Sequence, residues 1–171
     1  IPPFCQEMIR IYQHGDHIAI AEIFSRAVHE IASEHYSAEQ CLAWSDKEPN
    51  PEHWKKRCEL KRPFVALRGS KIAGFLELDA DGHIDCAYVN PDFKREGVMS
   101  SLVKHAVVTA FAMNLPRVYV EASICAKPLF EREGFDCLSE NQVEIGGITL
   151  LNCRMELKNK KTQSKPHPPT T

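Results

Sequence analysis

The sequence lacks the patterns that mark membrane, secreted or nucleic-acid-binding proteins. It has no run of about 18 apolar residues, and no basic start followed by a long apolar stretch, so we expect neither a membrane span nor a secretory signal. Its formal net charge is −2 and the two signs are interspersed. Without a face of Lys and Arg that could neutralise a run of phosphates, we expect no nucleic-acid partner.

Paired cysteine motifs are also absent. The seven cysteines, an odd number without any Cys-x-x-Cys pair, stand at positions 5, 41, 58, 86, 125, 137 and 153. This spacing indicates neither a disulfide framework nor a zinc site. We therefore expect free thiols, a cytoplasmic protein and no bound metal.

The composition is that of an ordinary globular protein, with 43% hydrophobic and 26% charged residues among 171. A chain of this length can bury one sizeable core. We expect a single domain over residues 1–157 and a flexible polar tail over 158–171, which is rich in Lys, Pro and Thr. Both a monomer and a homodimer are compatible with these features.

Apolar spacing and capping residues predict the helices. Apolar residues at three- and four-residue intervals indicate the longer helices. A serine–glutamine capping box and an Asn-Pro pair mark the starts of two short ones. The helices are expected from Asp16 as N-cap to Ile31, from Ser37, from Asn50, and over 102–111 and 126–133.

Short apolar segments bounded by turns predict the strands. They are expected at 7–13, 64–67, 72–78, 84–89, 117–121, 135–144 and 148–157. The three central ones follow one another as antiparallel hairpins. The next strand follows a helix, which makes a β-α-β unit. These features predict an α/β (α+β) fold, a mixed and mainly antiparallel sheet of about seven strands with helices on both faces.

The segment 88–102 joins the end of a strand to the start of a helix. A helix N-terminus carries free backbone amides and the positive end of the macrodipole, so such a loop can hold a pyrophosphate. Gly97 would let phosphate oxygens approach the backbone. A tight turn that needs a small residue is the alternative interpretation of this glycine.

Two blocks of the sequence resemble the GNAT superfamily of N-acetyltransferases. Lys94 to Met99, after Val89-Asn90-Pro91, is similar to its pyrophosphate loop, and Ser123 to Phe135 is similar to its Ser-x-x-Ala block with an aromatic pair and Gly-Phe. The resemblance extends from about residue 10 to residue 157 and points to a small bacterial branch. It implies the GNAT fold and acetyl-CoA as co-substrate.

The resemblance also implies which residues contact acetyl-CoA. The pantetheine arm is expected along the edge of Tyr88 and Val89, where the family's sheet splays apart, and a backbone amide there would bind the thioester oxygen. The implied contacts are Tyr88, Val89, Lys94, Arg95, Glu96, Gly97, Val98, Met99, Ser100, Ser101, Ser123, Ala126 and Phe130.

Three residues depart from the family pattern. Lys94 replaces Gln or Arg, which keeps a donor but changes its geometry. Met99 replaces a second small residue. Phe130 replaces a tyrosine that protonates the departing thiolate in relatives, so the general acid is in question. Coenzyme A can leave as a thiolate with little assistance, because a thiol has a pKa of about 8.5.

An alkyl ammonium with a pKa of about 10.4 must lose a proton before it attacks. Glu77, charged among apolar neighbours in a central strand, is the first candidate for the base; a solvent-facing strand residue is the alternative. Glu121 is the second candidate and Asp85 a third. Ser123 could donate a hydrogen bond to the leaving group.

Further candidates lie around the acceptor. His29, Tyr36 and Trp44 are candidates for substrate contacts, with ordinary packing as the alternative for each. Cys125 could form an acyl-cysteine, but relatives transfer the acyl group directly and a free cysteine commonly acts as a small buried hydrophobe.

The predicted function is direct acetyl transfer from acetyl-CoA to an amine of a small molecule or peptide. A non-catalytic acyl-CoA-binding regulatory module is the alternative, prompted by Phe130 and Met99. An interaction domain without a cofactor would require both motif blocks to be accidental. The sequence does not identify the acceptor.

Overall fold

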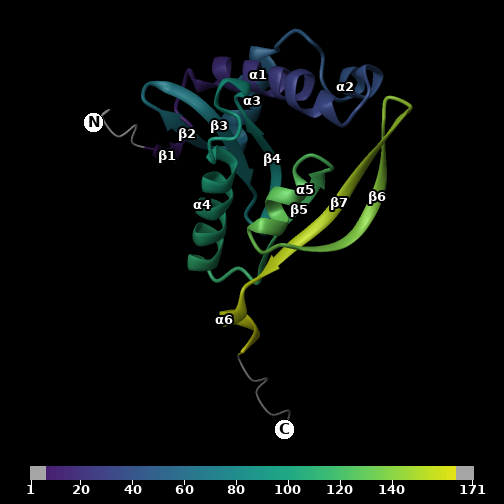
Figure 1. Ribbon diagram of the computed structural model, residues 1–171. Coiled ribbons are helices and arrows are strands. Elements are labelled where there is room, and N and C mark those ends of the chain that lie inside the picture. The colour runs from purple at the N-terminus through teal and green to yellow at the C-terminus, as the bar shows by residue number, and fades with distance from the viewer. Residues whose placement is uncertain (1–6, 165–171) are drawn as a thin grey trace.

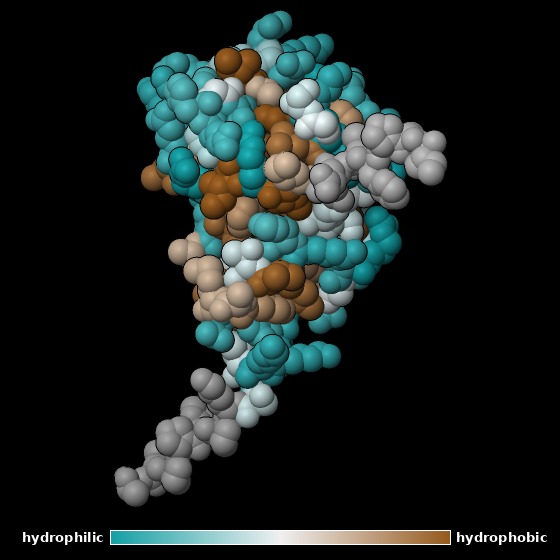
Figure 2. All heavy atoms as spheres, turned by 90° about the vertical axis from the view of Figure 1, so that its left-hand side faces the viewer, coloured by the Kyte–Doolittle hydropathy of each residue, from teal (hydrophilic) through white to brown (hydrophobic). Residues whose placement is uncertain are grey.

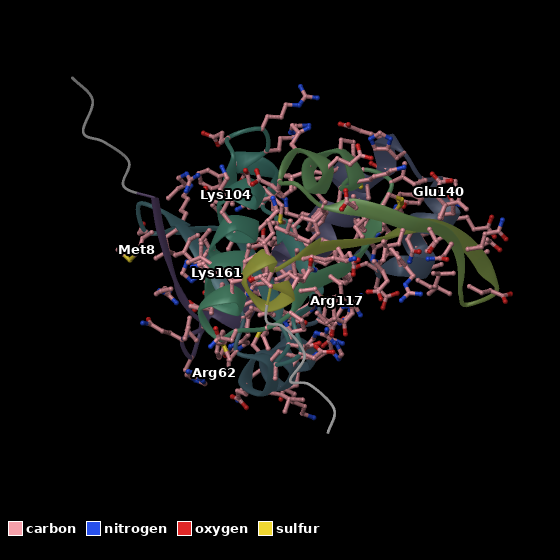
Figure 3. All side chains as sticks on the ribbon, turned by 90° about the horizontal axis from the view of Figure 1, so that it is seen from below. Met8, Arg62, Lys104, Arg117, Glu140 and Lys161 are labelled. Carbon is pink, nitrogen blue, oxygen red and sulfur yellow. A yellow bond between two sulfur atoms is a disulfide. The ribbon has the colours of Figure 1, made fainter. Side chains whose placement is uncertain are left out.

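Seven strands form one sheet in the computed structural model, which describes residues 7–164. The strands are β1 (Glu7–Ile11), β2 (Phe64–Arg68), β3 (Lys71–Leu78), β4 (His83–Val89), β5 (Arg117–Ser123), β6 (Asp136–Ile145) and β7 (Ile148–Lys158). Their spatial order is β1-β2-β3-β4-β5-β7-β6, with β4 and β5 parallel and all other neighbours antiparallel. The predicted mixed sheet is confirmed. Met8 of β1 and Glu140 of β6 lie far apart on opposite sides of the molecule (Figure 3).

Helices cover both faces of the sheet. They are α1 (Asp16–Arg26), continued by a π-helical turn, η1 (Ala27–Ile31), and a 3-10 turn, η2 (Ala32–Glu34), then α2 (Ala38–Trp44), α3 (Pro51–Lys61), η3 (Pro91–Phe93), α4 (Val98–Ala112), α5 (Lys127–Arg132) and α6 (Lys160–Gln163). Figure 1 shows α1, α2 and α3 together at the top and α4 beside the strands below. The helix expected to run from Asp16 to Ile31 therefore changes to π geometry for its last five residues.

Two of the three helix starts that were predicted from capping residues are confirmed. Ser37 forms its capping box with Gln40, and Asn50 accepts a hydrogen bond from the His53 amide at 3.1 Å. The first helix differs, because Gly15 is its N-cap with a φ of 101°. Asp16 lies one residue inside the helix, where its carboxylate accepts hydrogen bonds from the Gln13 amide and the Arg10 guanidinium.

Buried apolar clusters hold the layers together, and two of them join helices to the central strands. The larger joins α4 and α5 to the sheet through residues such as Leu102 and Phe130, and the second joins α1 and α3 to it through Trp54 and Phe75. Gly74 lets α4 approach β3 closely, because a Cβ there would stand 2.9 Å from Val98 Cγ1. The face that carries β1 and α4 shows apolar areas broken by polar ones (Figure 2).

The chain end and two cysteines differ from expectation. Residues 158–164, expected in the tail, belong to β7, α6 and their junction, where the Asn159 side chain donates to the Leu115 carbonyl at 3.0 Å. Residues 165–171 and Cys5 lie outside the described part. Cys137 and Cys153 form a disulfide between β6 and β7, which corrects the expectation of free thiols. The other four described cysteines are free. No helix among the described residues is long and apolar enough to span a membrane.

Candidate active site

The sheet opens between its two parallel strands. β4 and β5 pair only at His83 with Tyr119 and at Ile84 with Val120. The ladder between β3 and β4 shifts register between Leu76 and Leu78, and such a bulge bends a strand. Beyond Ile84 the two strands separate, which leaves the backbone groups of β4 on this side without a partner in β5.

The predicted pyrophosphate loop borders this opening. Arg95 and Gly97 have positive φ values of 63° and 78°, and α4 begins directly after them. The first hydrogen bond within the helix joins the Ser101 amide to the Gly97 carbonyl at 3.0 Å, so the amides of the preceding residues have no acceptor inside the helix. A Cβ at Gly97 would meet nothing within 4 Å. This glycine is therefore needed for its backbone conformation and not for close packing.

A hollow of about 520 Å³ lies against this loop. Lys94, Arg95 and Arg132 line it, together with apolar side chains from η1 and α5. Lys94 pairs with Glu34 at 3.6 Å. Free amides, a helix N-terminus and basic side chains around one cavity are the features that bind a phosphorylated ligand.

The hollow continues into the gap between the strands. A second hollow of about 180 Å³ shares Ile31, Val89, Met99 and Leu129 with the first. It is also lined by Tyr88, Ser123, Ala126 and Trp44. A third, of about 70 Å³, holds Asp85, Glu121, Ser123 and Phe130 on its walls. Neighbouring hollows share lining residues, so the three together trace a path from the predicted pyrophosphate loop to the acidic side chains of β4 and β5.

The predicted loop residues do not all face this path. Val98 is buried in the core at 1% exposure. The Ser100 hydroxyl donates to Glu133 of the α5 end, so it fastens two helices. Lys94, Arg95, Gly97, Val98, Met99 and Ser100 line the hollow, whereas Glu96 and Ser101 do not.

Ser123 and Cys125 lie where β5 turns into α5. The Ser123 hydroxyl is 3.0 Å from the Cys125 sulfur and accepts a hydrogen bond from the Ala126 amide at 3.3 Å. Ser123 borders the second and third hollows, and Cys125 the first and second. Ser123 therefore places a hydroxyl group between the strands.

Two aromatic residues, Trp44 and Tyr88, line the second hollow together. The Trp44 indole donates to the Tyr88 hydroxyl at 3.0 Å. Burial raises the pKa of Tyr88 well above its usual range, so this hydroxyl stays protonated at neutral pH. Of the three predicted substrate residues, Trp44 lines the hollows.

The other two predicted substrate residues, Tyr36 and His29, contact backbone groups of neighbouring segments. The Tyr36 hydroxyl donates to the Leu151 carbonyl at 2.9 Å and accepts from the Ile124 amide at 3.0 Å. His29 Nε2 contacts the Ser45 carbonyl oxygen at 2.7 Å. Neither residue lines the three hollows.

Glu77 is fully buried and bound by Arg57. Its two carboxylate oxygens accept hydrogen bonds from Arg57 Nε and Nη2 at 2.8 and 2.7 Å. The same guanidinium contacts Asp85 at 2.8 Å, and Lys61 binds Asp85 and Asp79 at 2.8 Å each. Glu77 is thus not the solvent-facing residue of the alternative interpretation, because its exposure is 0%.

Three donor groups near Arg57 meet the spacing of a metal site. Oxygens of Glu77 and Asp85 and the Cys86 sulfur lie within 4.8 Å of one another. The Arg57 guanidinium contacts all three, so a positive charge already stands at this position. Burial, together with the charge of Glu77, raises the pKa of Cys86 to about 12.

Glu121 faces the third hollow and contacts His83. Its Oε2 pairs with His83 Nε2, and the side chain is 43% exposed. Within residues 7–164 no other hydrogen bond or ion pair reaches Glu121, which leaves Oε1 available. Sequence reasoning missed His83 and Arg57, because their partners lie 38 and 20 residues away along the chain.

Phe130 belongs to the core more than to the site. Its exposure is 2%, and its ring packs edge-to-face on Phe135 with centroids 5.1 Å apart. The ring reaches only the smallest of the three hollows.

A splayed pair of parallel strands beside a glycine loop and a helix N-terminus defines an acyltransferase of the GNAT type. The chain matches the family described as acetyltransferase (GNAT) domain over residues 32–157, and it belongs to that family. It is therefore an acetyl-CoA-dependent acyltransferase by class.

Individual relatives agree with this assignment. The chain is 35% identical over 150 residues to the uncharacterized N-acetyltransferase YafP of Escherichia coli K12, covering 88% of this chain and 95% of that protein. A GCN5-related N-acetyltransferase of Rhodopseudomonas palustris superposes with a TM-score of 0.83 at 27% identity, covering 90% of this chain and 96% of that one. YncA of Salmonella typhimurium, solved with its cofactor acetyl-CoA, shares the fold with a TM-score of 0.68 at 17% identity, covering 97% and 99%.

Proposed function

We propose that the protein transfers the acetyl group of acetyl-CoA directly to a primary amine of a small molecule or peptide. The observation that carries this proposal is the series of three neighbouring hollows with shared lining residues, which extends from the α4 N-terminus along the gap between β4 and β5 to Glu121. The path supplies phosphate donors at one end and a carboxylate at the other. An amine acceptor needs that carboxylate, because its pKa of about 10.4 keeps it protonated near neutral pH.

The residues around the path fit acetyl-CoA, which supplies an activated acyl group and a thiol leaving group. The free amides of the first α4 turn would bind the pyrophosphate, helped by Lys94 and Arg95. The edge of Tyr88 and Val89 has no strand partner on the β5 side, so its backbone groups are available to the amides of the pantetheine arm. The Ser123 hydroxyl would contact the same arm.

We assign the removal of the amine proton to Glu121. It borders the gap and has a free carboxylate oxygen, whereas both oxygens of Glu77 are bonded to Arg57. A base must come within hydrogen-bond reach of the proton it takes. In this assignment Glu77 anchors Arg57 below the site, and it stays the alternative base that mutagenesis must test.

A dedicated acid is not required for the leaving group. Phe130 has no proton to donate, and Ser123 and Tyr88 supply the nearest hydroxyl groups on the second hollow. A thiol with a pKa of about 8.5 departs as a thiolate without a strong acid. The alternative, a non-catalytic acyl-CoA-binding module, would require that acyl transfer is slow because the tyrosine is missing.

A panel of small amines, diamines, aminoglycosides and peptides, incubated with acetyl-CoA and read by thiol release, tests the proposal. We expect turnover on at least one acceptor and calorimetric binding of acetyl-CoA. Binding without turnover on any acceptor would support the regulatory module instead. Failure to bind acetyl-CoA would overturn the assignment of the cavity.

A further inference from the structure

We propose that His83 is a positioning residue that takes the amine proton from Glu121 and passes it to solvent, an inference that rests on the function proposed above. His83 is the first residue of β4, and β4 pairs with β5 at this point before the strands separate. It therefore lies at the closed end of the gap, beside the carboxylate that borders it.

The imidazole ring is held in one orientation by three contacts. Its Nε2 meets Glu121 Oε2, and its Nδ1 lies 3.3 Å from Asp79 Oδ2. The ring stacks on Tyr119, with centroids 4.8 Å apart and 26° between the planes. The side chain is 21% exposed, so a proton on the ring has access to water.

The charges around the ring set its protonation. Burial lowers the pKa of His83, but the hydrogen bond and charge of Glu121, with Asp79 and Asp85, outweigh it, so the pKa is raised. Lys61 binds Asp79 and Asp85 from α3. On the other side the Tyr119 hydroxyl donates to Asp81, and Arg117 lies over the Tyr119 ring at 4.3 Å. Arg117 is labelled in Figure 3.

The proton moves in two balanced steps. In the first, an N–H bond of the bound ammonium breaks and an O–H bond forms on Glu121, which leaves a neutral amine. In the second, that O–H bond breaks and an N–H bond forms at His83 Nε2, so Glu121 is a carboxylate again and the ring is an imidazolium. Asp79 stabilises this cation through Nδ1–H, and water then accepts the proton.

The close contact between Nε2 and Oε2 holds a proton, so it corresponds to the imidazolium form of the ring. The relay requires that this proton leave to water before each turnover, which gives a neutral ring with its hydrogen on Nδ1 toward Asp79. Activity must therefore rise with pH through the ionisation of His83, and the raised pKa places that rise above the ordinary value of about 6.5. A ring that only supported Glu121 mechanically would produce no such rise. The pH profile thus separates the relay from a structural role.

The main test is His83→Gln in the full chain, with kcat/KM measured from pH 5.5 to 9 on an acceptor found in the panel. Glutamine keeps an N–H donor for Glu121 but cannot store a proton. We expect kcat/KM at pH 7.5 to fall at least tenfold, its rise above pH 6.5 to disappear, and acetyl-CoA affinity to stay within twofold. The exposed His14 before α1 provides the matched control, and His14→Gln should keep the wild-type profile.

A second variant keeps the proposal testable if His83→Gln does not fold. Asp79→Asn removes the carboxylate beside Nδ1 of His83. It should move the rise of kcat/KM to lower pH, because the imidazolium loses a stabilising negative charge. A wild-type profile in His83→Gln, or an unmoved rise in Asp79→Asn, would overturn the relay while the acyltransferase assignment stands. A wild type without turnover on any amine would overturn the proposed function and this inference with it.

Discussion

The substitution Glu77→Gln separates the two candidate bases. In the native protein the buried carboxylate holds Arg57 through two hydrogen bonds of 2.8 and 2.7 Å. A glutamine of the same size keeps one acceptor but loses the negative charge. Removing one partner of a buried ion pair costs about 3–5 kcal/mol. Arg57 is 27% exposed and still binds Asp85, so we expect a smaller loss than this range, about 2–3 kcal/mol of unfolding free energy.

This loss should appear in thermal unfolding and not in the chemistry. For a protein of this size, 1 kcal/mol corresponds to roughly 2–4 °C, so the Tm should fall by about 5–10 °C. Turnover measured well below the new Tm should change less than about threefold, whereas loss of a general base costs about 10² or more. Calorimetry should show unchanged acetyl-CoA affinity.

Glu121→Gln is the companion variant. Glu121 is 43% exposed and pairs only with His83 among the described residues. The Tm of the Glu121→Gln protein should therefore differ from that of the wild type by less than about 2 °C, as for surface substitutions. Its turnover should fall by about 10². A folded Glu77→Gln protein with a hundredfold loss, beside an active Glu121→Gln protein, would refute the assignment and return the base to Glu77.

Three further predictions concern the loop, the core and pH. Gly97→Glu should weaken acetyl-CoA binding at least about tenfold, or 1.4 kcal/mol, by calorimetry. The control is Gly69→Glu in the β2–β3 turn, where the glycine has a φ of 60° and equally open surroundings. This variant should bind acetyl-CoA normally, and equal losses of affinity in the two variants would contradict the loop assignment. Phe130→Tyr should change turnover by less than about threefold, or 0.7 kcal/mol, and a tenfold gain at unchanged affinity would mean that leaving-group protonation limits the rate. Burial raises the pKa of Asp85, but the Lys61 hydrogen bond and the Arg57 and Lys61 charges outweigh it and lower the value. Its stabilising contribution should be complete above about pH 5 and lost as pH falls below 4, so the Tm of Asp85→Asn should depend less on acid than that of the wild type.

The sequence by itself determined the elements and their order. Strand and helix periods and the Ser37 capping box are local signals, since each depends on residues a few positions apart. They predicted seven strands and the β-α-β unit correctly. The prediction of Asp16 as the N-cap was wrong because its side chain binds other groups nearby. Its carboxylate binds Arg10 and the Gln13 amide, and Gly15, which tolerates positive φ, takes the cap.

The sequence also singled out the loop that borders the 520 Å³ hollow, because a strand end, a glycine and a helix start follow one another within a few residues there. Its side chains were predicted less well. The sequence does not reveal that Val98 points into the core or that Ser100 binds Glu133, since both contacts depend on how closely α4 and α5 pack.

Only the tertiary structure decided which charged groups meet. Arg57 and Glu77 come from a helix and a strand, and His83 and Glu121 from two parallel strands joined through α4. Cys137 and Cys153 meet because β6 and β7 form a hairpin with a register shift between Cys137 and Ser139. Spacing along the chain does not encode such distances. They follow from strand register and from the bulge that opens β4 away from β5, and these are set by packing of the whole domain.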